Sequence, residues 1–205
     1  MMRYLIPLTV FVCFLISESV AGIVFQKETI TATVTACDTL EIRGVYFFVN
    51  SDTSIMSTVI YYPLPVDSVL DYPHYIMVTD LSNKRNVEYM KKKEGVTWKQ
   101  VIPPRSTDSV LVVYRQKTRK AKGRYILTTT RNWKRPLERA DFTVIIPSDI
   151  TLTYWSLQSD SVSMRNGTIT YHSFQKNFFP DRDMLLEWEC EKKRKGMRKY
   201  RNEEQ

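Results

Sequence analysis

Hydrophobic and polar residues alternate with a period of two along most of this chain from residue 23 onward, and helical periodicity is almost absent. The clearest example is residues 28–37. One face of this segment carries Ile30, Ala32, Val34 and Ala36, and the other carries Thr29, Thr31, Thr33 and Thr35. Threonine is β-branched and tolerates a solvated strand face, so the pattern predicts a half-buried strand.

Similar runs recur with turn signals between them and predict about a dozen short strands. The clearest hairpin is residues 160–174, because Asn166-Gly167 accepts positive φ at both central turn positions. A second hairpin is expected where the strands ending at Tyr114-Arg115 and spanning residues 124–130 flank a basic turn. The strand at residues 55–62 and the proline-rich residues 62–73 suggest a crossover between sheets.

This organisation predicts an all-β fold. Many short strands without a βαβ rhythm favour an antiparallel β-sandwich, with a β-barrel as the alternative. The expected division is a signal peptide at residues 1–21, a β-sandwich domain at 22–190 and a basic tail at 191–205.

The first 21 residues have the three parts of an export signal. Arg3 supplies a positive start, residues 4–16 are apolar, and Ser19-Val20-Ala21 places small residues before a cleavage site at Gly22. The alternative is an uncleaved membrane anchor. No later stretch approaches the ~20 apolar residues of a transmembrane helix. We therefore expect a periplasmic or extracellular location, with no transmembrane segment after cleavage.

Two cysteines, Cys37 and Cys190, remain after the expected cleavage. An even pair in an oxidising compartment favours one disulfide between the two ends of the domain over two independent buried thiols.

The net charge of +8 is concentrated in two regions. Residues 114–136 hold nine Lys or Arg and no acid, and residues 191–205 contribute +4, so the remainder carries −5. The aromatic residues within the first region suggest a nucleic-acid surface. However, its charges divide between a turn and a later loop, roughly 23 Å apart along one strand. The tail is expected to be solvated, with contact to an anionic surface as the alternative.

Signals for catalysis are weak. His74 and His172 are the only histidines, and no HxH, HExxH, CxxC or G-x-S-x-G spacing occurs. Asp181 and Asp183 raise the question of a glycosidase carboxylate pair, but they follow a Phe-Phe-Pro turn and begin a strand. We therefore predict no catalytic residue, no metal site and no cofactor.

Aromatic residues supply the candidate binding site. The basic loop after residue 130 carries Arg131, Trp133, Lys134 and Arg135, and the adjacent Tyr154 and Trp155 point to opposite faces of a strand. Such side chains stack on sugars or anchor a protein partner. The competing interpretation is that the aromatic residues of this chain fill the faces of the sandwich.

Two stretches, YYPLPVDSVLDYP and RYILTTTRNWKRPLERADFTVIIP, carry a resemblance to a family. With them the chain resembles uncharacterised exported bacterial β-sandwich proteins, a domain of unknown function. The resemblance implies the fold and the compartment, and it implies no activity, cofactor or functional residue.

Three functions follow as hypotheses. The first is a noncatalytic exported module that binds an envelope protein or an acidic glycan. The second is an envelope-polymer hydrolase that uses Asp181, Asp183 or a site assembled in space. The third is polyanion or nucleic-acid binding through residues 114–136 and the tail, which export makes the least favoured.

Overall fold

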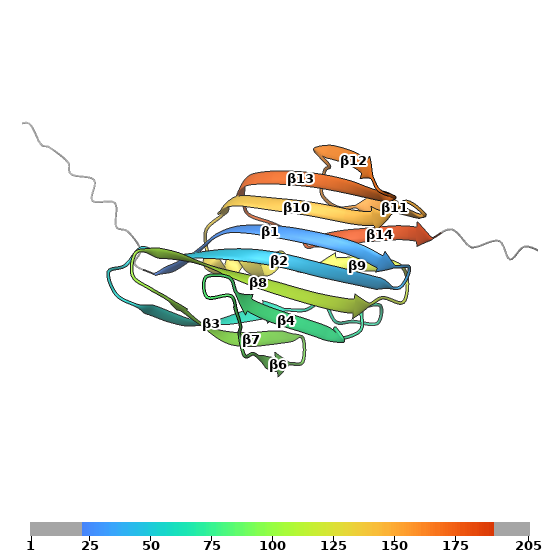
Figure 1. Ribbon diagram of the computed structural model, residues 1–205. Coiled ribbons are helices and arrows are strands. Elements are labelled where there is room, and N and C mark those ends of the chain that lie inside the picture. Colours follow the sequence, from blue (N-terminus) through green and yellow to red (C-terminus); the bar gives the residue numbers. More distant parts are fainter. Residues whose placement is uncertain (1–21, 191–205) are drawn as a thin grey trace, which may run out of the picture.

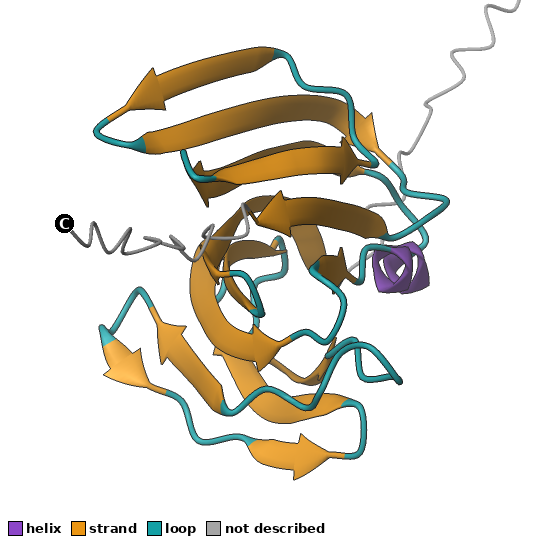
Figure 2. Cartoon of the chain, turned by 90° about the vertical axis from the view of Figure 1, so that its right-hand side faces the viewer, coloured by secondary structure: helices purple, strands orange, loops and turns teal. Residues whose placement is uncertain are grey.

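The chain folds into three β-sheets over residues 22–190, which are the residues that the computed structural model describes. The strands are β1 (Ile23–Ala36), β2 (Thr39–Asn50), β3 (Met56–Pro63), β4 (Tyr75–Asp80), β5 (Arg85–Asn86), β6 (Met90–Lys92), β7 (Gly95–Ile102), β8 (Ser106–Lys117), β9 (Lys122–Tyr125), β10 (Leu137–Pro147), β11 (Ile150–Trp155), β12 (Ser161–Arg165), β13 (Thr168–Phe178) and β14 (Met184–Cys190). The 3₁₀ helix η1 (Thr128–Trp133) lies beside them (Figure 2).

The large sheet has eight strands in the order β12-β13-β10-β1-β2-β8-β4-β5 (Figure 1). Two small sheets, β11-β14-β9 and β3-β7-β6, have three strands each. None of the three closes on itself within residues 22–190. The fold is therefore the all-β, sandwich-like architecture that the alternation predicted, and not the barrel alternative.

Both small sheets pack on the same face of the large sheet. Gly123 of β9 lies against Leu40 of β2, and Tyr62 of β3 lies against Tyr46 of β2. Leu40 and Tyr46 are separated by an even number of residues, so they share one face of β2. A single hydrophobic core joins the three sheets.

The centre of the large sheet contains a pairing that the alternation did not predict. Strand β1 pairs antiparallel with β2 on one side and parallel with β10 on the other. Parallel strands require a long crossover, and here the chain between β1 and β10 forms most of the remaining sheets.

The hairpin expected at Asn166-Gly167 is confirmed. Strands β12 and β13 pair antiparallel up to Arg165 and Thr168, and φ is 51° at Asn166 and 71° at Gly167. Positive φ at both central residues is the turn geometry that matches the twist of the flanking strands.

The second expected hairpin is wrong. Strand β8 belongs to the large sheet, whereas β9 pairs with β14 in a small sheet, and Thr128–Trp133 is a 3₁₀ helix, not strand. The reason is that β2 and β4 already occupy both edges of β8. The returning segment therefore has no free ladder edge on β8 and pairs elsewhere.

The crossover at residues 62–73 is confirmed, because this segment leads from β3 in a small sheet to β4 in the large one. Gln116 holds it in place through its side-chain amide, which donates to the carbonyls of Pro65 and Asp71.

The expected disulfide is also present. Cys37 and Cys190 are bonded with their Cα atoms 5.9 Å apart, and the bond links the turn after β1 to the end of β14. No helix within residues 22–190 is long and apolar enough to cross a membrane. The expected signal peptide and the basic tail lie outside the described residues.

Candidate functional site: a cavity between the sheets

A cavity of about 350 Å³ lies between the two small sheets, over the face of the large sheet that both of them cover. Strands β1 and β2 form one wall, β3 and β7 form the second, and β9 with η1 forms the third. Because β3 and β9 are edge strands of separate sheets, no ladder joins them and a gap remains. Its volume falls in the range of small-molecule sites.

A β-bulge in β1 shapes the first wall. The register between β1 and β2 shifts between Phe25 and Lys27, so one extra residue, Gln26, is accommodated. Without the bulge, Phe25 and Glu28 would point to opposite faces. With it, both side chains are buried on the inner face and line the cavity.

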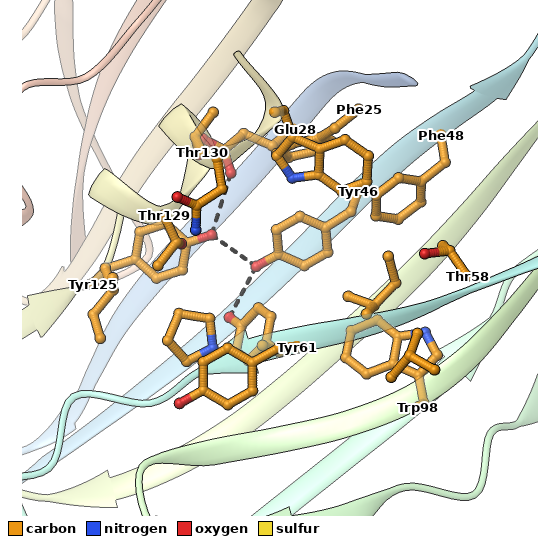
Figure 3. A pocket seen from close by; sticks show the side chains of 17 residues that line it. Phe25, Glu28, Tyr46, Phe48, Thr58, Tyr61, Trp98, Tyr125, Thr129 and Thr130 are labelled. Atoms are coloured by element: carbon orange, nitrogen blue, oxygen red, sulfur yellow. Dashed lines mark hydrogen bonds between the residues drawn. The ribbon is translucent and has the colours of Figure 1, made fainter. Parts of the chain in front are cut away.

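Three tyrosine hydroxyls, one from each sheet, meet at the cavity (Figure 3). Tyr46 of the large sheet lies at the centre, with its hydroxyl 2.9 Å from that of Tyr62 and 2.8 Å from that of Tyr125. Tyr125 also donates to Oε2 of Glu28 at 3.2 Å. The result is a hydrogen-bonded chain that fixes all three walls relative to one another.

Glu28 ends this chain and is only 2% exposed. Its other oxygen, Oε1, has no hydrogen-bond partner among the described residues. Burial removes the carboxyl group from water and raises its pKa to about 8, against the lowering effect of the Tyr125 hydrogen bond. At neutral pH the carboxyl group is therefore mainly protonated.

The three hydrogen-bonded tyrosines, Tyr46, Tyr62 and Tyr125, stay neutral near neutral pH. Burial raises the pKa of Tyr46, Tyr62 and Tyr125 well above its usual value, and the nearby Glu28 carboxyl adds to the effect. Glu28 is thus the group at this site whose charge changes near neutral pH.

Gly44 leaves space for the side chain of Tyr46, the central member of the hydrogen-bonded tyrosines. A Cβ atom at this position would collide with the hydroxyl and ring of Tyr46, its neighbour two residues along the same face of β2. The glycine therefore allows the Tyr46 ring to lie along the strand and bring its hydroxyl to Tyr62 and Tyr125.

Packed rings form another part of the wall. Trp133 on η1 lies 5.8 Å from Phe25 and 5.7 Å from Phe48, measured between ring centroids. Tyr61 and Trp98 line the β3 and β7 side (Figure 3). Eight of the described lining residues are aromatic and none is Lys, Arg or His.

Helix η1 is held in place by Asp183 of the loop before β14. One oxygen of Asp183 accepts hydrogen bonds from the backbone N–H groups of Leu127 and Thr128 and from the Thr128 hydroxyl. This carboxylate therefore caps the helix that carries Trp133.

The structure places the predicted binding residues in two regions. Trp133 lines the cavity, while Arg131, Lys134 and Arg135 are exposed beside it on the same loop. The guanidinium of Arg131 lies over the ring of Phe179. Tyr154 and Trp155 lie on β11 and do not line the cavity. Ligand contact by any of them stays a prediction.

The four residues considered for catalysis do not share a cleft. Asp181 pairs with Arg182 at the surface, and Asp183 caps η1. His74 is exposed just before β4, and His172 on β13 lies 3.8 Å from Asp141. No cluster of three or more metal-ligating side chains occurs within residues 22–190.

Much of the positive charge of residues 114–136 is paired. Five of the nine basic residues there have acidic partners: Arg115 with Glu41, Lys117 with Asp38, Arg119 with Asp71, Lys122 with Glu187 and Arg124 with Asp67. These partners reduce the field that a phosphate backbone would meet.

A second hollow, of about 540 Å³, lies near Asp108. Unlike Glu28, Asp108 has donors for both oxygens, from Ser82 and the Ser109 N–H on one and from Gln100 on the other. The carboxylate in the second hollow therefore already has its hydrogen-bond partners within the protein, so the first cavity is the stronger candidate site.

Sequence reasoning missed Glu28 and the partnership of the tyrosines. A signal for Glu28 was present, because extending the alternation of β1 backwards places it on the apolar face with Ile30 and Ala32. A carboxylate on a buried face is unusual unless it is paired or functional. Nothing in the local sequence indicated that Tyr46, Tyr62 and Tyr125 contact one another, because they lie on three different sheets.

Comparison with known proteins supports the fold. No protein-family model matches this chain, and no curated protein matches its sequence, so the resemblance to an exported family stays an expectation. A "putative nutrient binding protein" from Legionella pneumophila has a similar structure, with a TM-score of 0.66, 15% identity and coverage of 81% of this chain. An M1 zinc metallopeptidase from Deinococcus radiodurans aligns with a TM-score of 0.48 at 13% identity, over 81% of this chain.

This chain spans 66% of the Legionella protein and 42% of the Deinococcus enzyme. At these identities the Legionella match shows a shared all-β fold and nothing about the ligand.

Proposed function

We propose that this chain is an exported, noncatalytic binding protein that holds a small organic molecule in the cavity between its sheets. The observation that carries the proposal is the combination of a ring-lined cavity with a buried polar chain that ends in an unpartnered carboxyl oxygen. Mostly apolar walls with a few placed polar groups are typical of small-molecule sites.

The size of the cavity limits which of the partners expected from the sequence could bind in it. An envelope protein or an acidic glycan would engage this site only through a side chain or a terminal residue that enters it. A cavity of about 350 Å³ suits one small ring-bearing molecule better than an extended polymer. The disulfide is compatible with export to an oxidising compartment.

The two competing functions have less support. An envelope-polymer hydrolase would need converging acid and base groups, whereas Asp183 is engaged as a cap and Asp181 in a surface ion pair. Polyanion binding through residues 114–136 would rest on the four basic residues there that have no acidic partner within residues 22–190.

A screen with a matched pair of variants tests the proposal. Thr58 lines the cavity from β3, and its neighbour Ser57 is exposed. Ligand-observed NMR would be run with aromatic amines, aromatic amino acids, nucleosides and monosaccharides. We expect binders of the wild type to be lost in Thr58→Trp, which fills the cavity, and retained in Ser57→Trp. Absence of binders, or binders indifferent to Thr58→Trp, would contradict the proposal.

A further inference from the structure

We propose that the cavity selects an organic cation, with an ammonium group seated against Glu28 and an apolar or aromatic body among the rings. This inference rests on the proposed function, because it takes the cavity as a binding site and adds the charge of its ligand. Three observations carry it: the unpartnered oxygen of Glu28, the absence of basic residues from the described lining, and the aromatic walls.

In the ionised form of Glu28, the unpartnered oxygen requires a hydrogen-bond donor. Oε1 of Glu28 is buried, and an acceptor left unpaired in the interior costs free energy. The hydroxyls of Tyr46, Tyr62 and Tyr125 already serve Oε2 or one another. An ammonium group brings both the N–H donors and the charge that an ionised carboxylate needs.

The hydroxyl chain favours the ionised carboxylate once a cation is present. Each hydroxyl has one proton to donate. With Tyr125 donating to Oε2 of Glu28, Tyr46 can donate to Tyr125 and Tyr62 to Tyr46. All three hydroxyl protons then point toward the negative charge of Glu28. None of the three tyrosines has to change its direction of donation when Glu28 ionises.

The walls complement a positive ligand. Faces of Trp and Tyr rings attract cations within about 6 Å of the ring centroid. Trp133, Trp98 and Tyr61 line the cavity together with the three tyrosines of the chain. Because no Lys, Arg or His stands among the described lining residues, a carboxylate or phosphate ligand would lack a counter-charge.

Charged groups on the surrounding elements are engaged elsewhere. The pairs are Asp141 with Arg139 on β10, Glu41 of β2 with Arg115, and Arg124 of β9 with Asp67. Lys27 of β1 lies over Phe47, and Arg131 of η1 lies over Phe179. Lys122 of β9 pairs with Glu187. The other basic residues on these elements, on β7 and on the loop after η1 are exposed to solvent: Arg43, Lys99, Lys134 and Arg135. Salt screens such exposed charges within about 8 Å at physiological ionic strength, whereas a buried carboxylate is screened much less.

Cation binding is therefore coupled to the release of a proton. Without ligand, the Glu28 carboxyl group has a raised pKa of about 8 and keeps its proton at neutral pH. When an ammonium group arrives, the carboxyl group ionises and its proton passes to solvent, so the charge inside the cavity balances. Affinity for a cation should then rise with pH up to about 8 and level off above it.

Calorimetric titration with three probes of similar shape tests the inference. The probes are phenethylamine, 2-phenylethanol and 3-phenylpropionate, which are cationic, neutral and anionic. A primary amine remains charged between pH 6 and 8.5. Repeating the titrations in buffers of different ionisation enthalpy measures proton release. Glu28→Gln removes the charge, and Glu88→Gln makes the same change at an exposed residue that has no hydrogen-bond partner within residues 22–190.

We expect phenethylamine to bind at least about tenfold more tightly than the other two probes at pH 8, with affinity falling up to about tenfold per pH unit below that. About one proton should be released at pH 7. Glu28→Gln should abolish both the charge preference and the proton release, and Glu88→Gln should keep both.

Equal binding of the neutral and cationic probes, or no proton release by the wild type, would overturn the inference without touching the proposed function. Failure of all three probes to bind would also overturn it. The screen with Thr58→Trp decides separately whether the cavity binds small molecules. The proton count is made on the wild type, so the test does not depend on a variant folding.

Discussion

At the scale of single residues, the site depends on how closely Tyr46 approaches its own strand. The ring of Tyr46 occupies the space above Gly44, and this placement brings its hydroxyl to Tyr62 and Tyr125. Because Gly44 has no side chain, Tyr46 can reach both small sheets and join them to the large sheet by hydrogen bonds.

Replacement of Gly44 by Ala should destabilise the protein. The new Cβ would force the Tyr46 ring to move, at a cost of roughly 1–3 kcal/mol for overpacking, and would break the hydroxyl contacts. Urea unfolding measures the change. Gly22→Ala is the control, because a Cβ atom there would have no atom within 4 Å beyond its own residue and its two chain neighbours. In a double-mutant cycle with Tyr46→Phe, additive effects would contradict a shared mechanism.

Burial of Glu28 should make the stability of the protein depend on pH. Its pKa rises from 4.5 unfolded to about 8 folded, so the folded state binds the extra proton between these values. The stability due to this protonation is full below about pH 4.5 and is lost as pH rises through 8. Compared with Glu28→Gln, the wild type should lose roughly 3 kcal/mol between pH 5 and pH 8. Parallel stability curves for the two proteins would contradict the burial of an ionisable Glu28.

At the scale of elements, one wall of the cavity depends on a short helix capped from a distant loop. Asp183→Ala should cost roughly 1–2 kcal/mol, as loss of an N-terminal cap does, and should loosen η1. Hydrogen exchange should accelerate at residues 128–133 and stay unchanged in β14. The control is Asp181→Ala, since Asp181 makes only an exposed ion pair with Arg182 among the described residues. Equal effects of the two variants would refute the capping role.

The elements also show what the sequence can predict. Period-two alternation identified the strands, and Asn166-Gly167 identified its hairpin, because both signals are local. The pairing of β9 with β14 could not be read in the same way. It depends on β8 already being flanked by β2 and β4. The cavity was equally hidden, since it lies between edge strands of sheets whose order only the folded chain defines.

At the scale of the whole molecule, the disulfide ties the large sheet to a small one across 153 residues of sequence. A bond that closes so long a loop restricts the unfolded chain strongly. Replacing Cys37 and Cys190 by Ser should therefore lower the free energy of unfolding by roughly 2–5 kcal/mol. Chemical denaturation of the double variant measures this loss. Unchanged stability would show that the three-sheet core holds without the link.

Entry of ligands into the cavity between the sheets can be followed directly at the four tryptophans of the protein. Trp98 and Trp133 line the cavity, whereas Trp155 and Trp188 do not. The measurement is ¹H–¹⁵N NMR of the indole N–H groups during titration with the tightest binder from the screen. We predict that the Trp133 signal moves most, with Trp98 following, while Trp155 and Trp188 stay in place. Movement of Trp155 with a stationary Trp133 would place binding on β11 and contradict the account.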